Sequence, residues 1–218
     1  MTDKGYNKFK RSLDNHDFMT PEHIATFLRN NKTGVDNHGR QALAQIIEKF
    51  HRNETVVDAA CGTCVNWELF RMRSTPCKYI GVDRTADFLA HAHNLYQDEI
   101  ELKLGYVQEL PFADGEVEVV IMRHILEHLQ EGYELAIREG LRVASKELIL
   151  VFFLDLDEGL YDKIQESDPD ERGCTFFWNT YSWPKLIGFL SEFGYEIKMD
   201  RILTPGASAA DTIVRIIK

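Results

Sequence analysis

The sequence lacks any apolar segment long enough to cross a membrane. Its longest apolar run, LILVFFL at residues 148–154, is far shorter than the roughly 20 residues that a spanning helix needs. The opening residues, MTDKGYNKFKRSLDNHD, hold neither an apolar core nor a small-residue cleavage site, which argues against a secretion signal. Four cysteines in 218 residues are too few for a disulfide scaffold. These absences predict a protein of the reducing cytoplasm.

Basic residues are also scarce. The chain has 25 lysines and arginines against 35 acidic residues, which gives a net charge of −10. A surface of this sign repels phosphate backbones, so nucleic acid is not an expected partner. A basic cluster near the start, from Lys4 to Arg11, is typical of a solvated terminus. The length and the hydrophobic content of 44% suit one domain with a single core.

What the sequence does contain is a regular alternation of helix-like and strand-like segments. Apolar spacing and capping residues predict helices at 21–30, 40–50, 65–73, 86–97, 133–144 and 182–193. Short β-rich runs predict strands at 55–60, 78–83, 101–107, 116–122, 147–154, 195–203 and 211–218. Alternation from residue 55 to about 154 indicates right-handed crossovers and a parallel sheet covered on both faces. The last two strands predict an antiparallel hairpin at one edge.

The whole chain, residues 1–218, is expected to form one α/β domain. Residues 1–50 would be an N-terminal helical cap, 55–218 the sheet core, and 155–181 an insertion within it. In open parallel sheets, ligands bind beyond the carboxyl ends of the strands, where the strand order reverses. The first strand usually lies there, so residues 58–64 are expected at the ligand site.

The stretch VVDAACGTC, residues 56–64, agrees with this expectation. A strand that ends in Asp58 runs into small residues, which let a ligand approach the backbone at the start of a helix. Only Gly62 is a glycine, so the G-x-G-x-x-G pattern of nicotinamide-binding proteins is missing. Asp83 ends the next strand and is placed to accept hydrogen bonds from a ribose; a turn or helix cap is its alternative role.

Three segments together resemble the class I S-adenosylmethionine-dependent methyltransferases. VVDAACGTC resembles the family's first motif, an acid followed by G-x-G-x-G, with Ala60 and Cys64 where glycines usually stand. YIGVD, which ends at Asp83, resembles the second motif. GYVQELPFADGEVEVVIMRHILEHL, residues 105–129, resembles the segment from L-P-F to L-E-H-L and is the most specific match. The resemblance implies S-adenosyl-L-methionine as cofactor and a Rossmann-like three-layer sandwich. Its seven-stranded, mostly parallel sheet would have the order 3-2-1-4-5-7-6, with the last strand antiparallel.

Matching positions define the cofactor site that the resemblance implies. Tyr106 stands where the family often has an aspartate facing the adenine amino group, and either Gln108 or Glu109 is expected to take over that contact. The expected cofactor-binding residues are Asp58, Ala59, Ala60, Cys61, Gly62, Asp83, Arg84, Gln108, Glu109, Leu110 and Arg123.

Acceptor contacts are expected from the segments after the fourth and fifth strands. Arg123 and His124 are the candidate catalytic residues, since they border the transferred methyl group and histidine can take a proton near neutral pH. The aromatic stretch 174–183 suits a ring, a lipid-like tail or a cationic amine, with lid packing as an equal alternative. The candidate substrate-binding residues are His128, Phe176, Phe177, Trp178 and Tyr181.

The resulting hypothesis is in-line methyl transfer to an oxygen or nitrogen of a small-molecule acceptor. No N/D-P-P-Y/F stretch follows the fourth strand, which argues against DNA bases and glutamine side chains as acceptors. The alternatives on the same fold are a cofactor-binding or interaction protein with weak or absent catalysis, and a methyltransferase of macromolecules. Self-association as a homodimer is left open.

Two motifs favour metal chemistry, and their context argues against it. HILEH, residues 124–128, fits the zinc-peptidase signature H-x-x-E-H, which would place His124 and His128 one turn apart on a helix. Cys61 and Cys64 form a C-x-x-C pair, but neither of the other two cysteines supplies a second pair at ligand spacing. The HILEH letters also occur in the methyltransferase pattern, so no metal site is expected.

Overall fold

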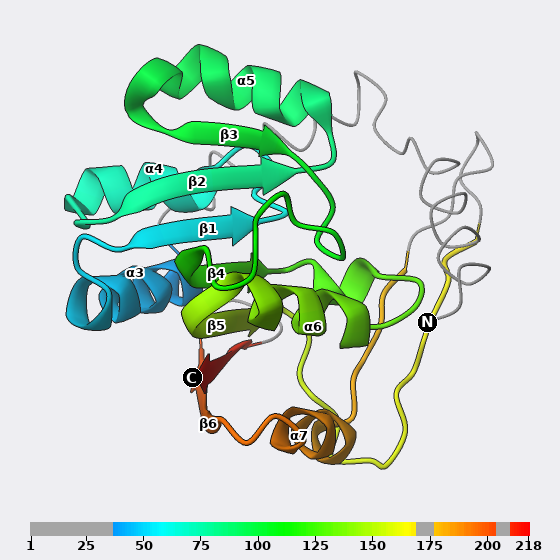
Figure 1. Ribbon diagram of the computed structural model, residues 1–218. Coiled ribbons are helices and arrows are strands. Elements are labelled where there is room, and N and C mark those ends of the chain that lie inside the picture. The colour runs from blue at the N-terminus through cyan, green and yellow to red at the C-terminus, as the bar shows by residue number, and fades with distance from the viewer. Residues whose placement is uncertain (1–36, 169–176, 204–209) are drawn as a thin grey trace.

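A computed structural model describes residues 37–168, 177–203 and 210–218 of the chain. Seven strands form one sheet in the order β3-β2-β1-β4-β5-β7-β6 (Figure 1). The parallel strands are β1 (Thr55–Ala59), β2 (Lys78–Asp83), β3 (Glu101–Leu104), β4 (Val117–Arg123) and β5 (Ala144–Phe152). β7 (Asp211–Ile217) runs antiparallel to both β5 and β6 (Glu196–Ile202). The predicted strand order and the antiparallel last strand are confirmed.

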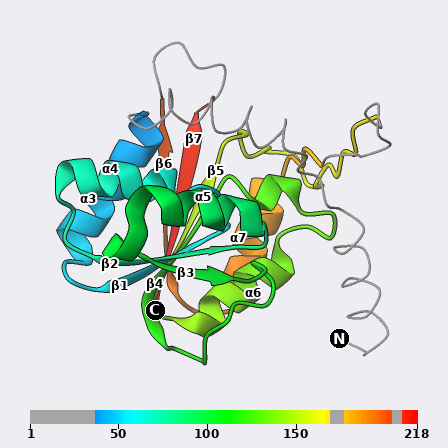
Figure 2. The same ribbon diagram turned by 90° about the horizontal axis from the view of Figure 1, so that it is seen from above.

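Helices cover both faces of the sheet and make the three layers of the sandwich (Figure 2). One face carries α3 (His38–Phe50), α4 (Val65–Arg73) and α5 (Ala86–Tyr96), and the other carries α6 (Glu134–Val143) and α7 (Trp183–Ser191). Short 3₁₀ turns, η1 (Gln97–Glu99) and η2 (Leu126–His128), follow α5 and β4. The expected helix at 21–30 lies outside the described residues, as does most of the expected cap. No helix in the described ranges is long and apolar enough to span a membrane.

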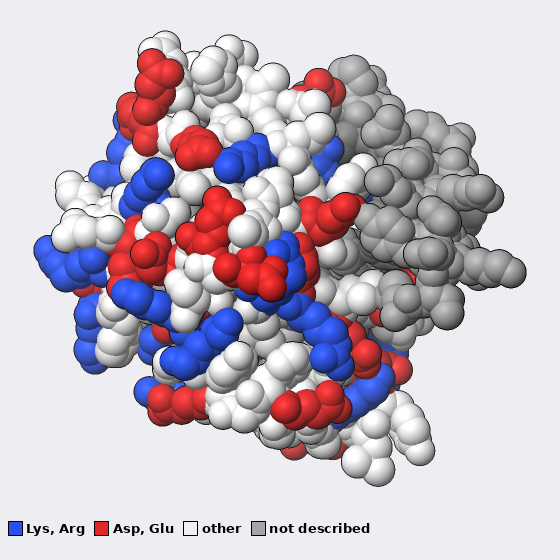
Figure 3. Space-filling model, viewed as in Figure 1, with Lys and Arg blue, Asp and Glu red and all other residues white. Residues whose placement is uncertain are grey.

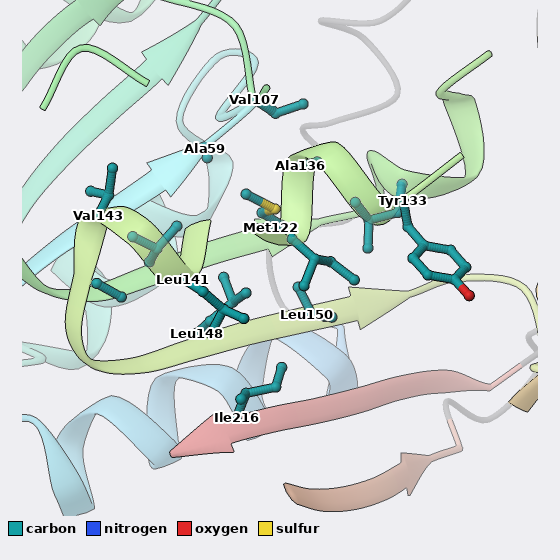
Figure 4. Close-up of a cluster of buried hydrophobic side chains, with 14 of the residues drawn as sticks. Ala59, Val107, Met122, Tyr133, Ala136, Leu141, Val143, Leu148, Leu150 and Ile216 are labelled. Carbon is teal, nitrogen blue, oxygen red and sulfur yellow. The ribbon is translucent and has the colours of Figure 1, made fainter. Parts of the chain in front are cut away.

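The core consists of two layers, one on each face of the sheet. Successive strand residues alternate between them: Val56 packs with α3 and α4, whereas Val57 packs under α6. Figure 4 shows the second layer, where Met122, Leu148 and Leu150 meet residues of α6. Central strands are therefore buried on both faces, which explains why the β5 segment reads as a continuous apolar run.

The largest departures from the expected strand bounds are in β3 and β5. β3 ends at Leu104 rather than at 107, and at the next residue, Gly105, an added Cβ would lie 2.9 Å from Pro111 Cδ. The chain then turns, and Tyr106 and Glu109 form an isolated bridge. β5 begins at Ala144 rather than at 147, since α6 ends at Val143 and passes directly into the strand.

The described parts of the insertion pair with each other instead of forming an open loop. Lys163 and Thr180 exchange two backbone hydrogen bonds of 2.8 and 3.0 Å, and Trp178 N–H donates to the Gln165 carbonyl at 2.9 Å. Isolated bridges join Lys163 with Thr180 and Glu166 with Phe177, and the two segments run side by side beyond α6 in Figure 1. This pairing brings Trp178 back to the carboxyl edge of the sheet.

Candidate functional site

The loop after β1 keeps a backbone conformation that usually requires glycine. Ala60, Gly62 and Cys64 have φ angles of 64°, 56° and 59°. All three lie in the left-handed region, which costs an L-residue roughly 1–2 kcal/mol. Ala60 and Cys64 are the positions where the resemblance expects glycines, so the loop retains that shape without those residues.

Asp83, at the end of β2, holds this loop in place. Its Oδ2 accepts a hydrogen bond from Gly62 N–H at 2.8 Å, and its Oδ1 accepts one from Thr85 N–H at 2.8 Å. The side chain is buried, and burial raises its pKa. A carboxylate offers about four acceptor positions, so the two backbone donors leave room for further donors such as hydroxyl groups.

Cys61 and Cys64 pack against β2. A Cβ placed on Gly81 would lie 2.9 Å from Cys64 Sγ and 3.0 Å from Cys61 Sγ. A hydrogen bond between the two thiols, together with burial, raises the pKa of Cys61 well above its ordinary value. A thiol with a raised pKa is a poor nucleophile and metal ligand. Within the described ranges, no group of three or more His, Cys, Asp or Glu side chains is placed to hold a metal ion.

Asp58 is a buried acid near the carboxyl end of β1, at the centre of the sheet edge where the parallel strands end. Its Oδ2 accepts hydrogen bonds from Tyr79 Oη and from Asn66 Nδ2, at 2.5 and 3.0 Å. Asn66 Oδ1 in turn accepts from Arg40 Nε at 3.1 Å. Burial raises the pKa of Asp58 to about 6, against the opposing effect of these donors and of the Arg123 charge. The network joins β1, β2, α3 and α4 around one carboxyl group.

A second charged group forms where β4 ends. Arg123 Nη2 donates to Asp211 Oδ2 at 3.2 Å, and His124 Nε2 lies 3.2 Å from Asp211 Oδ1. Burial and the nearby Arg123 charge lower the pKa of His124 to about 4, so its imidazole is neutral at physiological pH. Asp211 opens β7, far along the chain, and sequence reasoning missed it because no local pattern pairs it with β4.

Glu127 is buried next to this group. Its Oε1 accepts a hydrogen bond from Phe153 N–H at 2.6 Å, and burial raises its pKa to about 7. Glu127 Oε2 and Arg123 Nε have no hydrogen-bond partner among the residues that the structure describes. Buried polar atoms without partners are uncommon, and two at one strand edge are consistent with a site for a polar ligand.

The HILEH segment does not form the helix that a zinc site would need. His124 has a φ of 55°, and only Leu126–His128 forms a 3₁₀ turn. His124 faces Asp211, whereas His128 Nδ1 lies 2.8 Å from the Phe177 carbonyl oxygen. Different groups therefore hold the two imidazoles.

The sequence of residues 57–152 matches the protein family described as "Methyltransferase domain". This range runs from β1 to the end of β5 and contains the left-handed loop, Asp83 and the β4 edge. Within this range, the chain is similar to methyltransferase domains.

Two curated relatives are similar to part of the chain. Ajmaline N-methyltransferase from Rauvolfia serpentina is 29% identical over 132 residues, which are 57% of this chain and 43% of the relative. Norajmaline N-methyltransferase from the same plant is 27% identical over 126 residues, which are 55% of this chain and 42% of the relative. The matched part thus spans less than half the length of either relative.

A solved structure shares the fold. The 1,6-didemethyltoxoflavin-N1-methyltransferase of Burkholderia thailandensis, crystallised with 1,6-didemethyltoxoflavin and S-adenosylhomocysteine, aligns with a TM-score of 0.66 at 13% identity. The alignment covers 100% of this chain and 91% of that one. At this identity the likeness supports the fold alone.

The described residues fit S-adenosylmethionine, the cofactor of the methyltransferase family. The residues Ala59 to Gly62 have small side chains that let a ligand approach the loop backbone, and Asp83 retains acceptor capacity for hydroxyl groups. Gly105 N–H donates to the Asp83 carbonyl at 3.0 Å, which joins the segment holding Gln108 to the end of β2. In this segment Gln108 is half-buried, Glu109 is exposed, and Leu110 is buried with its N–H on Glu139 Oε1 at 2.7 Å. Arg84 is exposed beside Asp83.

The residues expected to bind substrate separate into different environments. Phe176 lies outside the described residues, and Phe177 is buried. Tyr181 lies in the core, where its hydroxyl donates to the Leu126 carbonyl. Trp178 is 48% exposed. Its ring meets those of His128 and Phe153 edge-on, with centroid distances of 5.1 and 5.7 Å. Sequence reasoning missed Phe153 because it lies within a continuous apolar run and reads as core.

Proposed function

We propose that this chain is an S-adenosylmethionine-dependent methyltransferase that acts on a nitrogen or oxygen of a small-molecule acceptor. The observation that carries the proposal is the Gly62–Asp83 hydrogen bond of 2.8 Å. It joins a left-handed loop of small residues to an acid at the end of the neighbouring parallel strand. S-Adenosylmethionine supplies a methyl group on a positively charged sulfur, which needs no further activation.

The chain's own contribution is mainly alignment and the exclusion of water, since methyl transfer is an in-line displacement. Asp83 would hold ribose hydroxyls, and the loop from Ala59 to Gly62 would place the rest of the cofactor along β1. Arg123 and His124 would face the acceptor at the end of β4. Asp58 would hold its hydrogen-bond donors, Tyr79 and Asn66, in fixed positions beside the loop.

A small-molecule acceptor is supported by three observations. Both curated relatives are named as N-methyltransferases of alkaloids, and the solved neighbour is named as an N1-methyltransferase of a small heterocycle. The exposed Trp178 offers an aromatic surface near the β4 edge. On the face seen in Figure 3, lysine and arginine side chains are interspersed with acidic ones, unlike the continuous basic surface that nucleic acid requires.

Calorimetric titration with S-adenosylmethionine and S-adenosylhomocysteine tests the cofactor site. Asp83→Ala is expected to weaken both ligands at least about tenfold, because hydrogen bonds to a charged group contribute roughly 1.5–3 kcal/mol. Asp87→Ala is the matched control, since Asp87 is an exposed acid in the first turn of α5 and should leave both affinities unchanged. Failure of the wild-type protein to bind either ligand would refute the methyltransferase proposal.

A second assay separates catalysis from binding alone. The wild-type protein is incubated with S-adenosylmethionine and a panel of small heterocyclic amines and phenols, and release of S-adenosylhomocysteine is measured. Release that depends on the acceptor supports the enzyme. Tight cofactor binding without release from any acceptor would favour the non-catalytic alternative.

A further inference from the structure

Asp211 connects the end of β4 to the opposite part of the chain. Its two carboxylate oxygens have different partners: Oδ2 accepts from Arg123 Nη2, and Oδ1 lies at the same distance, 3.2 Å, from His124 Nε2. His124 and Asp211 are 87 positions apart in the sequence, so only the folded sheet brings them together. Binding a cofactor along β1 and β2 does not require this arrangement.

The surroundings of Asp211 favour its ionised form. Burial alone would raise its pKa, but the His124 contact and the Arg123 charge outweigh burial and lower it. A Cβ on Gly39 would lie 1.8 Å from Asp211 Oδ2, so the first turn of α3 packs directly on the carboxylate. The N-terminal end of a helix carries partial positive charge, which stabilises an anion at that position.

An ionised Asp211 determines which nitrogen of His124 carries the proton. A carboxylate can only accept hydrogen bonds, so the proton shared with Oδ1 must belong to His124 Nε2. A neutral imidazole has a single N–H, and the pKa of His124, lowered to about 4 by burial and then by the Arg123 charge, keeps the ring neutral. Nδ1 is therefore left with its lone pair.

Two further contacts and a strained backbone conformation fix the position of the His124 ring. Its backbone N–H donates to the Val151 carbonyl at 2.8 Å, and its ring packs edge-on against Phe153 with a centroid distance of 5.2 Å. Its φ of 55° is strained for a residue other than glycine, and such strain is concentrated at functional sites. The His124 side chain nevertheless remains 26% exposed. Its position is therefore fixed while part of the ring stays accessible.

We propose that Asp211 is a positioning residue that holds His124 with its proton on Nε2 and its Nδ1 lone pair available to take a proton from the acceptor. This proposal rests on the proposed function. As the acceptor nitrogen or oxygen bonds to the methyl carbon, the carbon–sulfur bond breaks and its electron pair stays on sulfur. The acceptor's N–H or O–H proton passes to Nδ1, and water removes it from the imidazolium after release of the product.

The arrangement also limits the class of acceptor. An N–H or O–H becomes strongly acidic while the new bond forms, so a weak base is sufficient, and the Asp211 carboxylate stabilises the imidazolium that results. Substrates that gain from this arrangement carry a removable proton, as primary and secondary amines, ring N–H groups and phenols do. Tertiary amines and thioethers have no such proton.

Nuclear magnetic resonance of the full-length protein with ¹⁵N-labelled histidine tests the proposal, with and without S-adenosylhomocysteine. At neutral pH, His124 should show a protonated Nε2 and an unprotonated Nδ1, with assignment from a His124→Gln spectrum. His128 is an internal control of opposite tautomer, because its Nδ1 lies 2.8 Å from a carbonyl oxygen and must donate to it. A protonated Nδ1 on wild-type His124 would overturn the proposal.

Asp211→Asn provides a sharper test with a side chain of nearly the same shape. Arg123 can only donate, so the new amide oxygen should face Arg123 and the new NH₂ group should face His124, which reverses the His124 tautomer. Affinity for S-adenosylhomocysteine should stay within about twofold of wild type, which separates this result from a failure of the cofactor site. An unchanged His124 tautomer in this variant contradicts a positioning role. With the panel acceptor that gives the most release, kcat should fall about a hundredfold, the usual contribution of a proton acceptor.

Discussion

Replacing Ala60 with glycine should preserve or increase the stability of this protein, although glycine usually weakens a folded chain. Ala60 has a φ of 64°, and removing its Cβ relieves a strain of roughly 1–2 kcal/mol. Against this gain, glycine makes the unfolded chain more flexible, which costs roughly 0.4–1 kcal/mol. Ala60 is partly buried, so loss of its methyl forfeits a further ~0.4 kcal/mol, about half the value of a fully buried group.

These contributions predict a free energy of unfolding between about 0.4 kcal/mol below the wild-type value and about 1.2 kcal/mol above it. Ala59→Gly, one residue earlier, is the matched control, because Ala59 is fully buried in the extended strand β1. There glycine costs roughly 0.5–1 kcal/mol in the strand and the buried methyl contributes about 0.8 kcal/mol. The two variants should therefore differ by roughly 2 kcal/mol, with Ala60→Gly the more stable.

Urea denaturation followed by tryptophan fluorescence measures both variants and the wild type. The quantity compared is the difference in the free energy of unfolding between the two variants, since each removes one alanine methyl group. If Ala60→Gly is destabilised as much as Ala59→Gly, the left-handed conformation of the loop carries no strain and the reasoning fails.

Two further variants test packing and charge elsewhere in the domain. His51 lies 2.7 Å from carboxylate oxygens of both Glu54 and Glu147; burial opposes its charged form, but these contacts prevail and raise its pKa. Its stabilising effect is therefore complete below about pH 6.5 and is lost as the pH rises through the raised pKa. Thermal unfolding should show the wild type losing its advantage over His51→Gln above that pH, and a constant difference would contradict this. Gly81→Ala should destabilise the protein by about 1–3 kcal/mol through overpacking, since the new Cβ would lie 2.9 Å from Cys64 Sγ. Adding Cys64→Ala should recover part of that loss, and equal stabilities of the single and double variants would argue against the contact.

The sequence was sufficient to place Asp58 and Asp83 at the same edge of the sheet. Both acids end β-rich segments that are joined by a helix, and right-handed crossovers bring the carboxyl ends of neighbouring parallel strands to the same edge. The segments 65–73 and 78–83 also have the bounds that their local patterns indicate. Sheet order followed from the family resemblance, because alternation along a chain does not determine which strands are neighbours.

Local sequence could not reveal the group around Asp211. Its partners lie on β4, and α3 packs on it from a third part of the chain, so the contact exists only after the sheet has assembled. The pKa of His124 depends chiefly on burial, which the local sequence does not reveal, and then on the charge of the adjacent Arg123. The positive φ angles of Ala60 and Cys64 could not be predicted either, since alanine and cysteine prefer the right-handed and extended regions. The sequence by itself determined the succession of strands and helices along the chain and the acids that end the first two strands. Tertiary packing decided the strained loop, the ionised state of Asp211 and the tautomer of His124, because these depend on atoms that folding alone brings together.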